Sequence, residues 1–554
     1  MPGRKLSVLN AFAMFTREEK KNIAIYIVGI MLYKFGLEAF NGSITALATN
    51  RYDNDASIAG VPANTFERLG LLQGLNQAFQ CVGSILIAPL IKRFPTKLVL
   101  AVAVFCFGIL TAVLMIVDGA TGGRLKPAGA EADDFSYYGS YNTDGIIPIF
   151  CFTGIAYGMV ELIRRVIPRD IVGGNVQKLR RMDALVHIFY EVAGTSGAFC
   201  TALGLIPALG NNFSFIITPI CFTLAAITWY FVSNLNFRHP NSGLAAADKP
   251  SYLKSVLMGF VLFYRSVYTG AKIIFTSRKF IWLVPGYSVA LYAHRYLENG
   301  IGPVIARRYL GNSAWSQIMV GGSNFGELLG AAFVFLFTNL VTTPMPWLRL
   351  DALMLLIVWY LPYWTPPRNQ VRQAWIVAAT FLPVSFGWAA GDVSLAAYIQ
   401  ASLARKESEH KDVSALGAVM AFLYSTYIVT YAITQPLLGR YIDGVFTRTG
   451  GSSNGGTVRP AIRNVAGVQF TIIAVVIFAS SFIPRGSFAF NPQALYGEAL
   501  DKEVNDDDSS VGGSLEADSL KKERDYVNSA EIAQPGGRNS IVGTLEPVDA
   551  LRRS

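Results

Sequence analysis

The chain has 554 residues, of which 52% are hydrophobic and 15% are charged, and its mean hydropathy is +0.38. A composition this apolar excludes a soluble enzyme and is typical of a protein embedded in a membrane. The net charge of +10 does not indicate nucleic-acid binding, because the basic residues gather in polar segments between apolar runs. Their distribution follows the positive-inside rule and predicts that both termini are cytoplasmic, although the basic loop after residue 438 is an exception.

Residues 1–22 are charged and contain no cleavage site of a signal peptide, so we expect a cytoplasmic segment there and an uncleaved first run. Twelve apolar runs follow, nearly all long enough to cross the hydrocarbon core as a helix. The run at 348–364 is the shortest, because prolines close it early. The runs lie at 23–45, 68–92, 96–118, 146–167, 184–206, 213–235, 280–303, 314–339, 348–364, 373–401, 415–438 and 462–484.

The sixth and seventh runs are separated by a segment, 252–275, that mixes apolar and basic residues. We expect an amphipathic helix on the cytoplasmic face; the alternative, a thirteenth crossing, would place the carboxyl terminus outside. The last segment is rich in Asp, Glu, Ser and Gly and is predicted to be a disordered cytoplasmic tail. The predicted units are the segment 1–22, a six-helix half 23–237, a central loop 238–279, a second six-helix half 280–484 and the tail 485–554.

The first and seventh runs share a pattern that hydrophobicity does not require. Lys34 and Glu38 lie four residues apart in the first run, and His294 and Glu298 do so in the seventh. An Asn-Gly pair and then an Arg-Tyr pair follow in both runs. Such an internal duplication is typical of transporters whose two halves move about a central site.

Residues 88–97, Ala-Pro-Leu-Ile-Lys-Arg-Phe-Pro-Thr-Lys, resemble the Gly-x-Leu-x-Asp-Arg-x-Gly-Arg-Lys signature of the major facilitator superfamily. Leu90, Arg93 and Lys97 match it, whereas Lys92 replaces the aspartate and both glycines are missing. The resemblance, which covers residues 23–484, implies an all-α membrane protein with twelve helices in two pseudo-symmetric six-helix halves. It also implies a gating loop that includes Arg93 and Lys97 but lacks the family's charge partner.

Ionisable side chains inside apolar runs are costly, and they persist mainly beside an aqueous cavity or a partner. A spacing of four places Lys34 beside Glu38, and His294 beside Glu298, on one face of a helix. Such groups could take up and release a proton near neutral pH, or they could be ion pairs that fix helix packing. The candidate proton-coupling or cavity residues are Lys34, Glu38, His294, Arg295, Glu298, Glu327 and Asp392.

Neutral polar and aromatic side chains on the same helices are the candidates for contact with a solute. Because a tyrosine stripe in the eleventh run also fits simple packing, the tyrosines have two interpretations. The candidate substrate-binding residues are Gln73, Asn76, Gln77, Gln80, Gln317, Asn324, Tyr424 and Tyr427.

These features predict a secondary transporter, not an enzyme, that moves a small organic solute by alternating access coupled to protons. Its expected partners are the lipid bilayer, that of the plasma membrane, and the small-molecule substrate, with no nucleic acid, and we expect a monomer. No cofactor, metal or catalytic residue is predicted. The alternatives are an efflux pump for metabolites or drugs, a transporter of metals or metal chelates, a membrane-embedded enzyme, and a receptor derived from a transporter.

Overall fold

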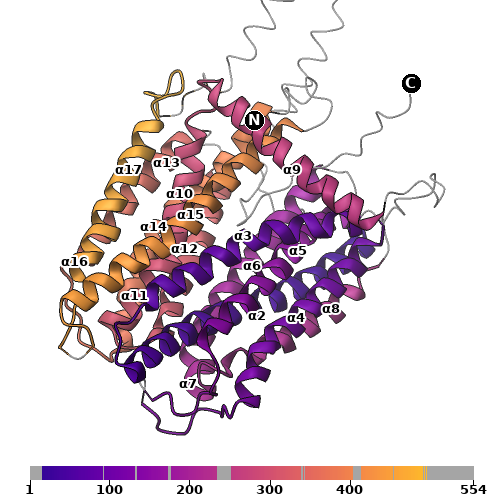
Figure 1. The fold of residues 1–554 in the computed structure, drawn as a ribbon. Helices are drawn as coiled ribbons and strands as arrows, with labels where there is room; N and C mark the ends of the chain where they lie inside the picture. Colours follow the sequence, from indigo (N-terminus) through magenta and orange to yellow (C-terminus); the bar gives the residue numbers. More distant parts are fainter. Residues whose placement is uncertain are drawn as a thin grey trace, which may run out of the picture.

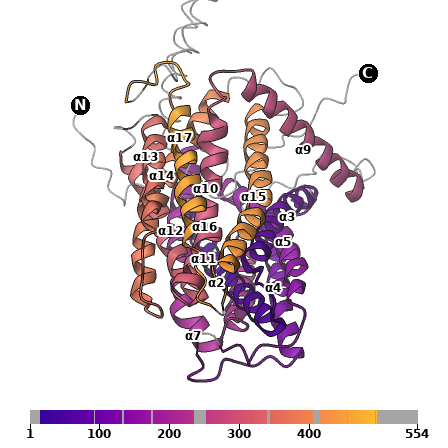
Figure 2. The ribbon, with the colours of Figure 1, turned by 60° about the vertical axis from the view of Figure 1, so that its left-hand side comes forward.

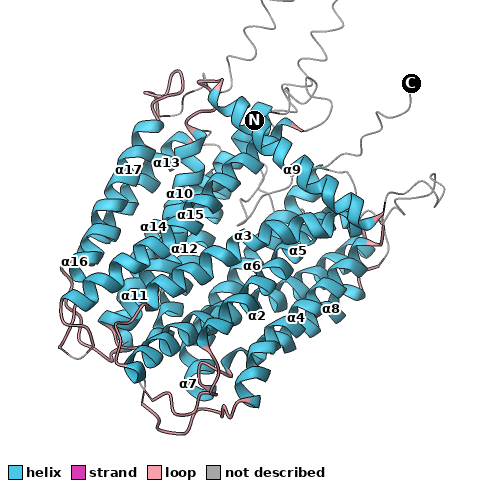
Figure 3. Ribbon diagram, in the orientation of Figure 1, coloured by secondary structure: helices cyan, strands magenta, loops and turns pink. Residues whose placement is uncertain are grey.

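The computed structural model describes residues 15–490, except 92, 132–133, 173–175, 234–250, 338–340, 342, 404–413 and 453, together with residues 492 and 495. Every regular element in these residues is a helix, which confirms the predicted all-α class (Figure 3). The predicted tail beyond residue 495, residues 1–14, Lys92 of the signature-like segment and most of the loop before the amphipathic segment lie outside the described residues.

The helices of the first half form one bundle, drawn in indigo to magenta in Figure 1. In it α2 packs against α6 and α8, α4 against α5 and α8, and α3 against α5. Its helices are α2 (Arg17–Ala59), α3 (Thr65–Ile91), α4 (Thr96–Ala120), α5 (Ile146–Val172), α6 (Val176–Cys200), α7 (Ile206–Leu209) and α8 (Ile217–Tyr230), with a π-helical turn at Thr201–Leu205 and short 3₁₀ turns at Thr143–Gly145 and Ser214–Ile216.

Helix α2 extends well beyond the predicted run 23–45. It begins at a capping box, in which Thr16 and Glu19 each accept a hydrogen bond from the other's backbone N–H, and it ends at Gly60, whose φ is 64°. In this extension Arg51 and Tyr52 are buried, and Arg51 donates hydrogen bonds of 3.0 and 2.8 Å to the carbonyls of Gly139 and Tyr141, whereas the last turn of the helix is exposed. Contacts with a distant loop therefore lengthen this helix beyond its apolar run.

The second half begins with a helical segment that π-helical turns interrupt repeatedly. It comprises Val284–Val289 (π), α10 (Ala290–Tyr296), Leu297–Ile301 (π), α11 (Gly302–Val304) and Ile305–Tyr309 (π). It is followed by a 3₁₀ turn at Ser313–Trp315, α12 (Ser316–Phe337), α13 (Met345–Leu355) with a 3₁₀ turn at Leu356–Tyr360, α14 (Val371–Leu403), α15 (Ala415–Arg448), α16 (Arg459–Ile462), a π-helical segment at Arg463–Val468 and α17 (Gln469–Ser480).

Helices occupy all twelve of the predicted ranges in the described part of the chain. Eight of these helical segments have the length and hydropathy needed to cross a membrane. The helical segments on the sixth to ninth runs are not among these eight. The chain is therefore a multi-pass membrane protein, and the total of twelve crossings stays a prediction.

The two halves meet where α3 packs on α15 and α6 packs on α12. A further helix, α9 (Tyr252–Phe275), has the bounds of the predicted amphipathic segment and contacts α3 and α15, one helix from each half. Figures 1 and 2 both show α9 at the end of the bundle opposite α7. These two ends are called the α9 end and the α7 end below.

Helices α3 and α5 cross so closely that only glycine fits at the contact. A Cβ atom added at Gly83 would lie 1.9 Å from the carbonyl oxygen of Ile155, and one at Gly158 would lie 2.0 Å from that of Gln80. Small residues at such crossings let helix backbones approach in membranes. By contrast, a Cβ added at Gly444 of α15 would meet nothing within 4 Å.

We therefore expect Gly83→Ala to destabilise the protein by roughly 1–3 kcal/mol, the usual cost of overpacking. Alanine is otherwise the better helix former by about 1 kcal/mol, so Gly444→Ala should be neutral or stabilising. Thermal unfolding of the purified variants in one detergent measures both effects. A Gly83→Ala midpoint equal to or above that of the wild type would contradict the close crossing.

Candidate functional site

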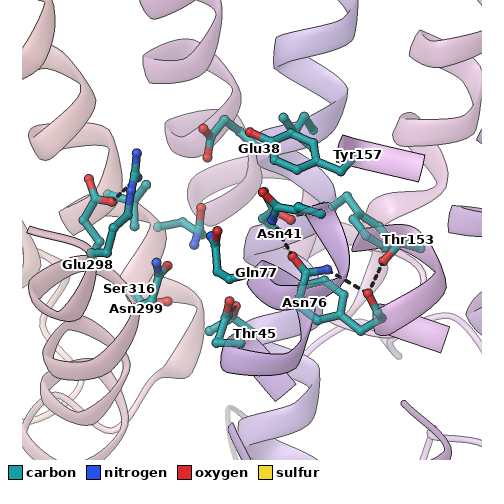
Figure 4. Close-up of a pocket in the computed structure, with 18 of the residues that line it drawn as sticks. Glu38, Asn41, Thr45, Asn76, Gln77, Thr153, Tyr157, Glu298, Asn299 and Ser316 are labelled. Atoms are coloured by element: carbon teal, nitrogen blue, oxygen red, sulfur yellow. Dashed lines mark hydrogen bonds and ion pairs between the residues drawn. The ribbon is translucent and has the colours of Figure 1, made fainter. Parts of the chain in front are cut away.

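A central cavity lies between the two halves, and side chains of both line it (Figure 4). Four of the lining residues are charged, namely Lys34 and Glu38 of α2 with Arg295 and Glu298 of the second half. Six of the lining residues are apolar. The remaining lining residues are amides and hydroxyls: Asn41, Thr45, Gln73, Asn76, Gln77, Gln80, Thr153, Tyr157, Asn299, Ser316 and Gln317.

On the first-half side, the cavity wall carries a buried ion pair. The Lys34 ammonium and the Glu38 carboxylate are in direct contact, and the two residues are 1% and 5% exposed. The Lys34 nitrogen also lies 4.6 Å from the ring centre of Tyr190, and the Arg164 guanidinium lies 4.5 Å from the same ring. Arg164 in turn pairs with Glu161. The predicted pairing of Lys34 with Glu38 is present, and a second buried pair lies behind it.

On the opposite wall, Glu298 is held by donors from two helices. Its Oε2 accepts a hydrogen bond of 2.8 Å from Arg295 Nη1, and its Oε1 accepts one of 2.5 Å from the Ser323 hydroxyl of α12. Figure 4 shows Glu298 facing the cavity from the side opposite Glu38. Glu298 and Asn299 sit in the π-helical turn Leu297–Ile301, a distortion that often marks functional positions.

The predicted pairing of His294 with Glu298 is wrong. His294 Nε2 lies 2.8 Å from Asp351 Oδ1 of α13, and its ring stacks on Trp388 of α14 at 5.2 Å between ring centres. His294 does not line the cavity. A spacing of four aligns two side chains only in a regular α-helix, and the π turn that starts at Leu297 changes the register. Arg295, three residues before Glu298, therefore takes the place predicted for the histidine.

Seven amide side chains line the cavity, and five of them fall into two groups. Three donate to fixed partners: Gln73 to the Thr45 hydroxyl at 3.1 Å, Asn76 to the Phe150 carbonyl at 2.7 Å and Gln80 to the Asn76 side chain at 2.9 Å. The other two are Gln77 and Gln317, whose side-chain oxygens have no hydrogen-bond partner among the described residues. A buried acceptor without a partner is costly. These two oxygens are therefore the positions at which a bound solute would gain most by donating a hydrogen bond.

Other predicted site residues lie outside the cavity lining. Glu327 of α12 and Asp392 of α14 are buried, on two helices that pack against each other. Asn324 is fully buried near Gly194 of α6, and neither of its amide atoms has a hydrogen-bond partner in the described part of the chain. Tyr424 and Tyr427 are both in the core of the second half, with ring centres 5.3 Å apart.

The predicted gating-loop residues lie in the first half, Arg93 between α3 and α4 and Lys97 in the first turn of α4. Lys97 Nζ donates a 2.8 Å hydrogen bond to the carbonyl of Val232, just after α8, and Arg93 lies in the turn before α4. These positions are at the α9 end, because the neighbouring end of α3 contacts α9.

A network of charged residues that the sequence did not reveal joins the two halves at the α7 end. Asp53 of α2 accepts hydrogen bonds of 2.7 Å from Arg307 Nε and 2.8 and 2.7 Å from Arg308. Asp443 of α15 accepts 2.8 and 2.9 Å bonds from the first backbone amides of α3, at Phe66 and Glu67. We call Asp53, Arg307, Arg308 and Asp443 the α7-end latch.

The repeated Arg-Tyr pair was the one available signal for this latch. Arg308 occupies in the second half the place that Arg51 occupies in the first, and the structure buries both at the α7 end. The Arg308 guanidinium also lies 5.2 Å from the ring centre of Phe66 and 4.2 Å from that of Phe446. Arg308 therefore touches helices of both halves.

No protein-family model matches the sequence, and no curated protein matches it. Solved structures share its fold over most of its length. The nucleoside transporter NupG, as a point mutant, matches with a TM-score of 0.55 and 12% identity over 82% of this chain and 99% of its own. The peptide transporter POT, as a point mutant in complex with alafosfalin, matches with a TM-score of 0.52 and 14% identity over 84% of this chain and 99% of its own. The xylose transporter XylE from E. coli, in a partially occluded inward-open conformation, matches with a TM-score of 0.50 and 12% identity over 85% of this chain and 98% of its own.

The paired bundles, the two contacts between them and these similarities define the fold of the protein. The chain has the major facilitator fold, as the segment 88–97 suggested. It is a multi-pass integral membrane protein whose polar cavity lies between two helical halves. All three structures named above are transporters.

Proposed function

We propose that this protein is a secondary transporter that moves a small polar organic solute by alternating access, coupled to protons. The observation that carries the proposal is the central cavity, where each half contributes a buried pair of opposite charges. Charges are retained inside an apolar bundle when they serve a water-reachable site. Nucleosides, peptides and xylose are the solutes of the transporters that share the fold, which supports a small organic molecule.

The lining chemistry supports a solute rich in hydrogen-bonding groups. Lys34 and Arg295 offer positive charge, Glu38 and Glu298 offer negative charge, and the amides between them offer both donors and acceptors. A zwitterionic or multiply hydroxylated solute complements this mixture, whereas a purely lipophilic one would leave the polar lining without partners.

The same pairs supply a route for coupling. A carboxylate beside a cation is stable as an anion, and the arrival of a solute group at Lys34 or Arg295 would weaken that pair and favour protonation. We therefore assign proton binding to Glu38 and Glu298. Proton and solute binding are then linked, because each changes the free energy of the other through one ion pair.

The latch supports the alternating part of the proposal. It closes the α7 end, so we assign the present state to access from the α9 end, which faces the cytoplasm if both termini are cytoplasmic. Movement of the halves would then break the latch and expose the cavity at the α7 end.

The proposed function is tested by comparing the metabolites of cells with and without the gene, and then measuring uptake of the leading solute into proteoliposomes. Accumulation driven by an imposed pH gradient is the expected result. Uptake that ignores the gradient would remove proton coupling, and absence of any flux would favour a receptor derived from a transporter.

We expect Gln77→Ala and Gln317→Ala each to raise the KM for that solute by roughly two- to tenfold, since a lost hydrogen bond costs about 0.5–1.5 kcal/mol. The maximal rate should change less, because neither side chain carries charge. Gln370→Ala, at an exposed position, is the matched control. Unchanged KM in both cavity variants would show that these oxygens do not contact the solute.

A further inference from the structure

Helix α9 spans the α9 end of the molecule and touches both halves. Its Tyr252 hydroxyl donates a 3.0 Å hydrogen bond to the carbonyl of Leu86 in α3. Near its other end, Gly270 packs against the backbone of Ala418 in α15, and the Phe275 ring meets the Phe422 ring edge-on at 5.7 Å. Figure 2 shows this helix running obliquely across the bundle. The protein therefore fixes one face of α9 and leaves the others exposed.

The faces of α9 differ sharply in chemistry. The face toward the protein contains Val256, Gly270, Ile273 and Ile274, all buried. An exposed apolar face lies next to it. Its residues recur at spacings of three, four or seven residues, which places them on one side of a helix. This face consists of Leu253, Leu257, Phe260, Val261, Tyr264, Tyr268 and Phe275.

A basic stripe borders the apolar face. Lys254, Arg265 and Lys272 are all exposed, and their spacings of eleven and seven residues correspond to about three and two helical turns, which aligns them on one side. The helix contains no Asp or Glu. No ion pair joins these three side chains to another described residue within 4.0 Å, so their charge is not neutralised in the described part of the protein.

From this arrangement, we propose that α9 is an interfacial helix whose basic stripe, Lys254, Arg265 and Lys272, binds the anionic headgroups of membrane lipids. The apolar face would enter the boundary between headgroups and acyl chains, and the stripe beside it would then lie at the level of the phosphates. Charge complementarity selects a negatively charged leaflet over a neutral one, because each basic residue near such a surface is attracted to it. Long Lys and Arg side chains reach the phosphate level easily.

A lipid site at this place would bear on both halves. Because α9 contacts α3 and α15, lipids that hold α9 in the interface act on a helix that bridges the α9 end. The inference does not depend on which solute is transported, so its failure and the failure of the proposed function are distinguishable.

The test uses the full-length protein in nanodiscs of phosphatidylcholine alone or mixed with phosphatidylglycerol. Native mass spectrometry of the released protein counts bound phosphatidylglycerol, and hydrogen exchange reports on residues 252–275. The variant K254Q/R265Q/K272Q is compared with R124Q/R440Q/R448Q, which removes the same charge from exposed residues at the α7 end. Unfolding midpoints in pure phosphatidylcholine check that both variants are folded.

We expect the α9 variant to lose its preference for phosphatidylglycerol by about tenfold or more, and to lose the extra protection of α9 in the mixed discs. The control should retain both. Equal losses in the two variants would mean that net charge alone attracts the lipid, and unchanged binding in the α9 variant would mean that the stripe is not the site; either result overturns the proposal. A dimeric mass with α9 protected in every lipid would show that a second copy covers the helix, and would also overturn it.

Discussion

Glu298→Gln is expected to abolish accumulation of the solute against its gradient while leaving exchange of solute across the membrane. The glutamine keeps the size of the side chain and its contact with Ser323, but it cannot carry a proton or balance Arg295. Loss of a buried charge partner typically costs about 3–5 kcal/mol, so proton-driven uptake should fall by roughly a hundredfold or more. Uptake under a pH gradient and equilibrium counterflow, measured on the same vesicles, separate the two activities.

Glu131→Gln, at an exposed loop position, is the matched control and should behave as the wild type. If Glu298→Gln still concentrates the solute under a pH gradient, Glu298 carries no coupled proton. A failure of both uptake and counterflow, with normal folding, would place Glu298 in solute binding instead of coupling.

The Lys34 and Glu38 pair needs a different design, because either single change leaves an uncompensated buried charge. Replacing both, as K34M/E38Q, removes the charges together and is often neutral for stability when a pair is merely structural. A folded double variant with wild-type coupled transport would assign the pair to helix packing. Lost coupling in a folded double variant would support the role that we propose for Glu38.

Asp53→Asn is expected to open the α7 end. Asp53 binds both Arg307 and Arg308 across the two halves, and the substitution removes the negative charge of that contact, so the two guanidinium groups are better solvated by water in the open state. At roughly 3–5 kcal/mol, the cost to the closed state is enough to shift an equilibrium more than a hundredfold. Spin labels can be placed at residues 58 and 448, which are exposed near the ends of α2 and α15. Opening of the α7 end should appear as a new population with a longer distance between the two labels.

The labelled protein requires replacement of its five cysteines. Asp144→Asn is the control, because its pair with Arg68 has a separation of 3.6 Å, both side chains are more than 40% exposed, and both residues belong to the first half. Such exposed pairs contribute about 0–1 kcal/mol. An unchanged distance distribution in Asp53→Asn would mean that the latch does not hold the α7 end closed.

Local patterns predicted correctly what depends on a single stretch of chain. Lys34 and Glu38 pair because both lie in one regular helix, where a spacing of four suffices. The amphipathic helix was predicted with its observed bounds, since its mixed composition is continuous from residue 252 to residue 275. The same rule failed at His294, where a π turn altered the register and a residue of α13, Asp351, became the partner.

Run length and hydropathy are enough to predict a helical membrane protein, because the thickness and apolarity of the bilayer act directly on each stretch of chain. The same runs contain the costly buried charges from which the site is built. Which of those charges meet depends on the packing of the helices. Asp53 and Arg308 are separated by 255 residues, and two aligned bundles bring them together. Contacts between side chains of different helices depend on how the bundles pack, and the spacing of residues within one helix does not predict that packing.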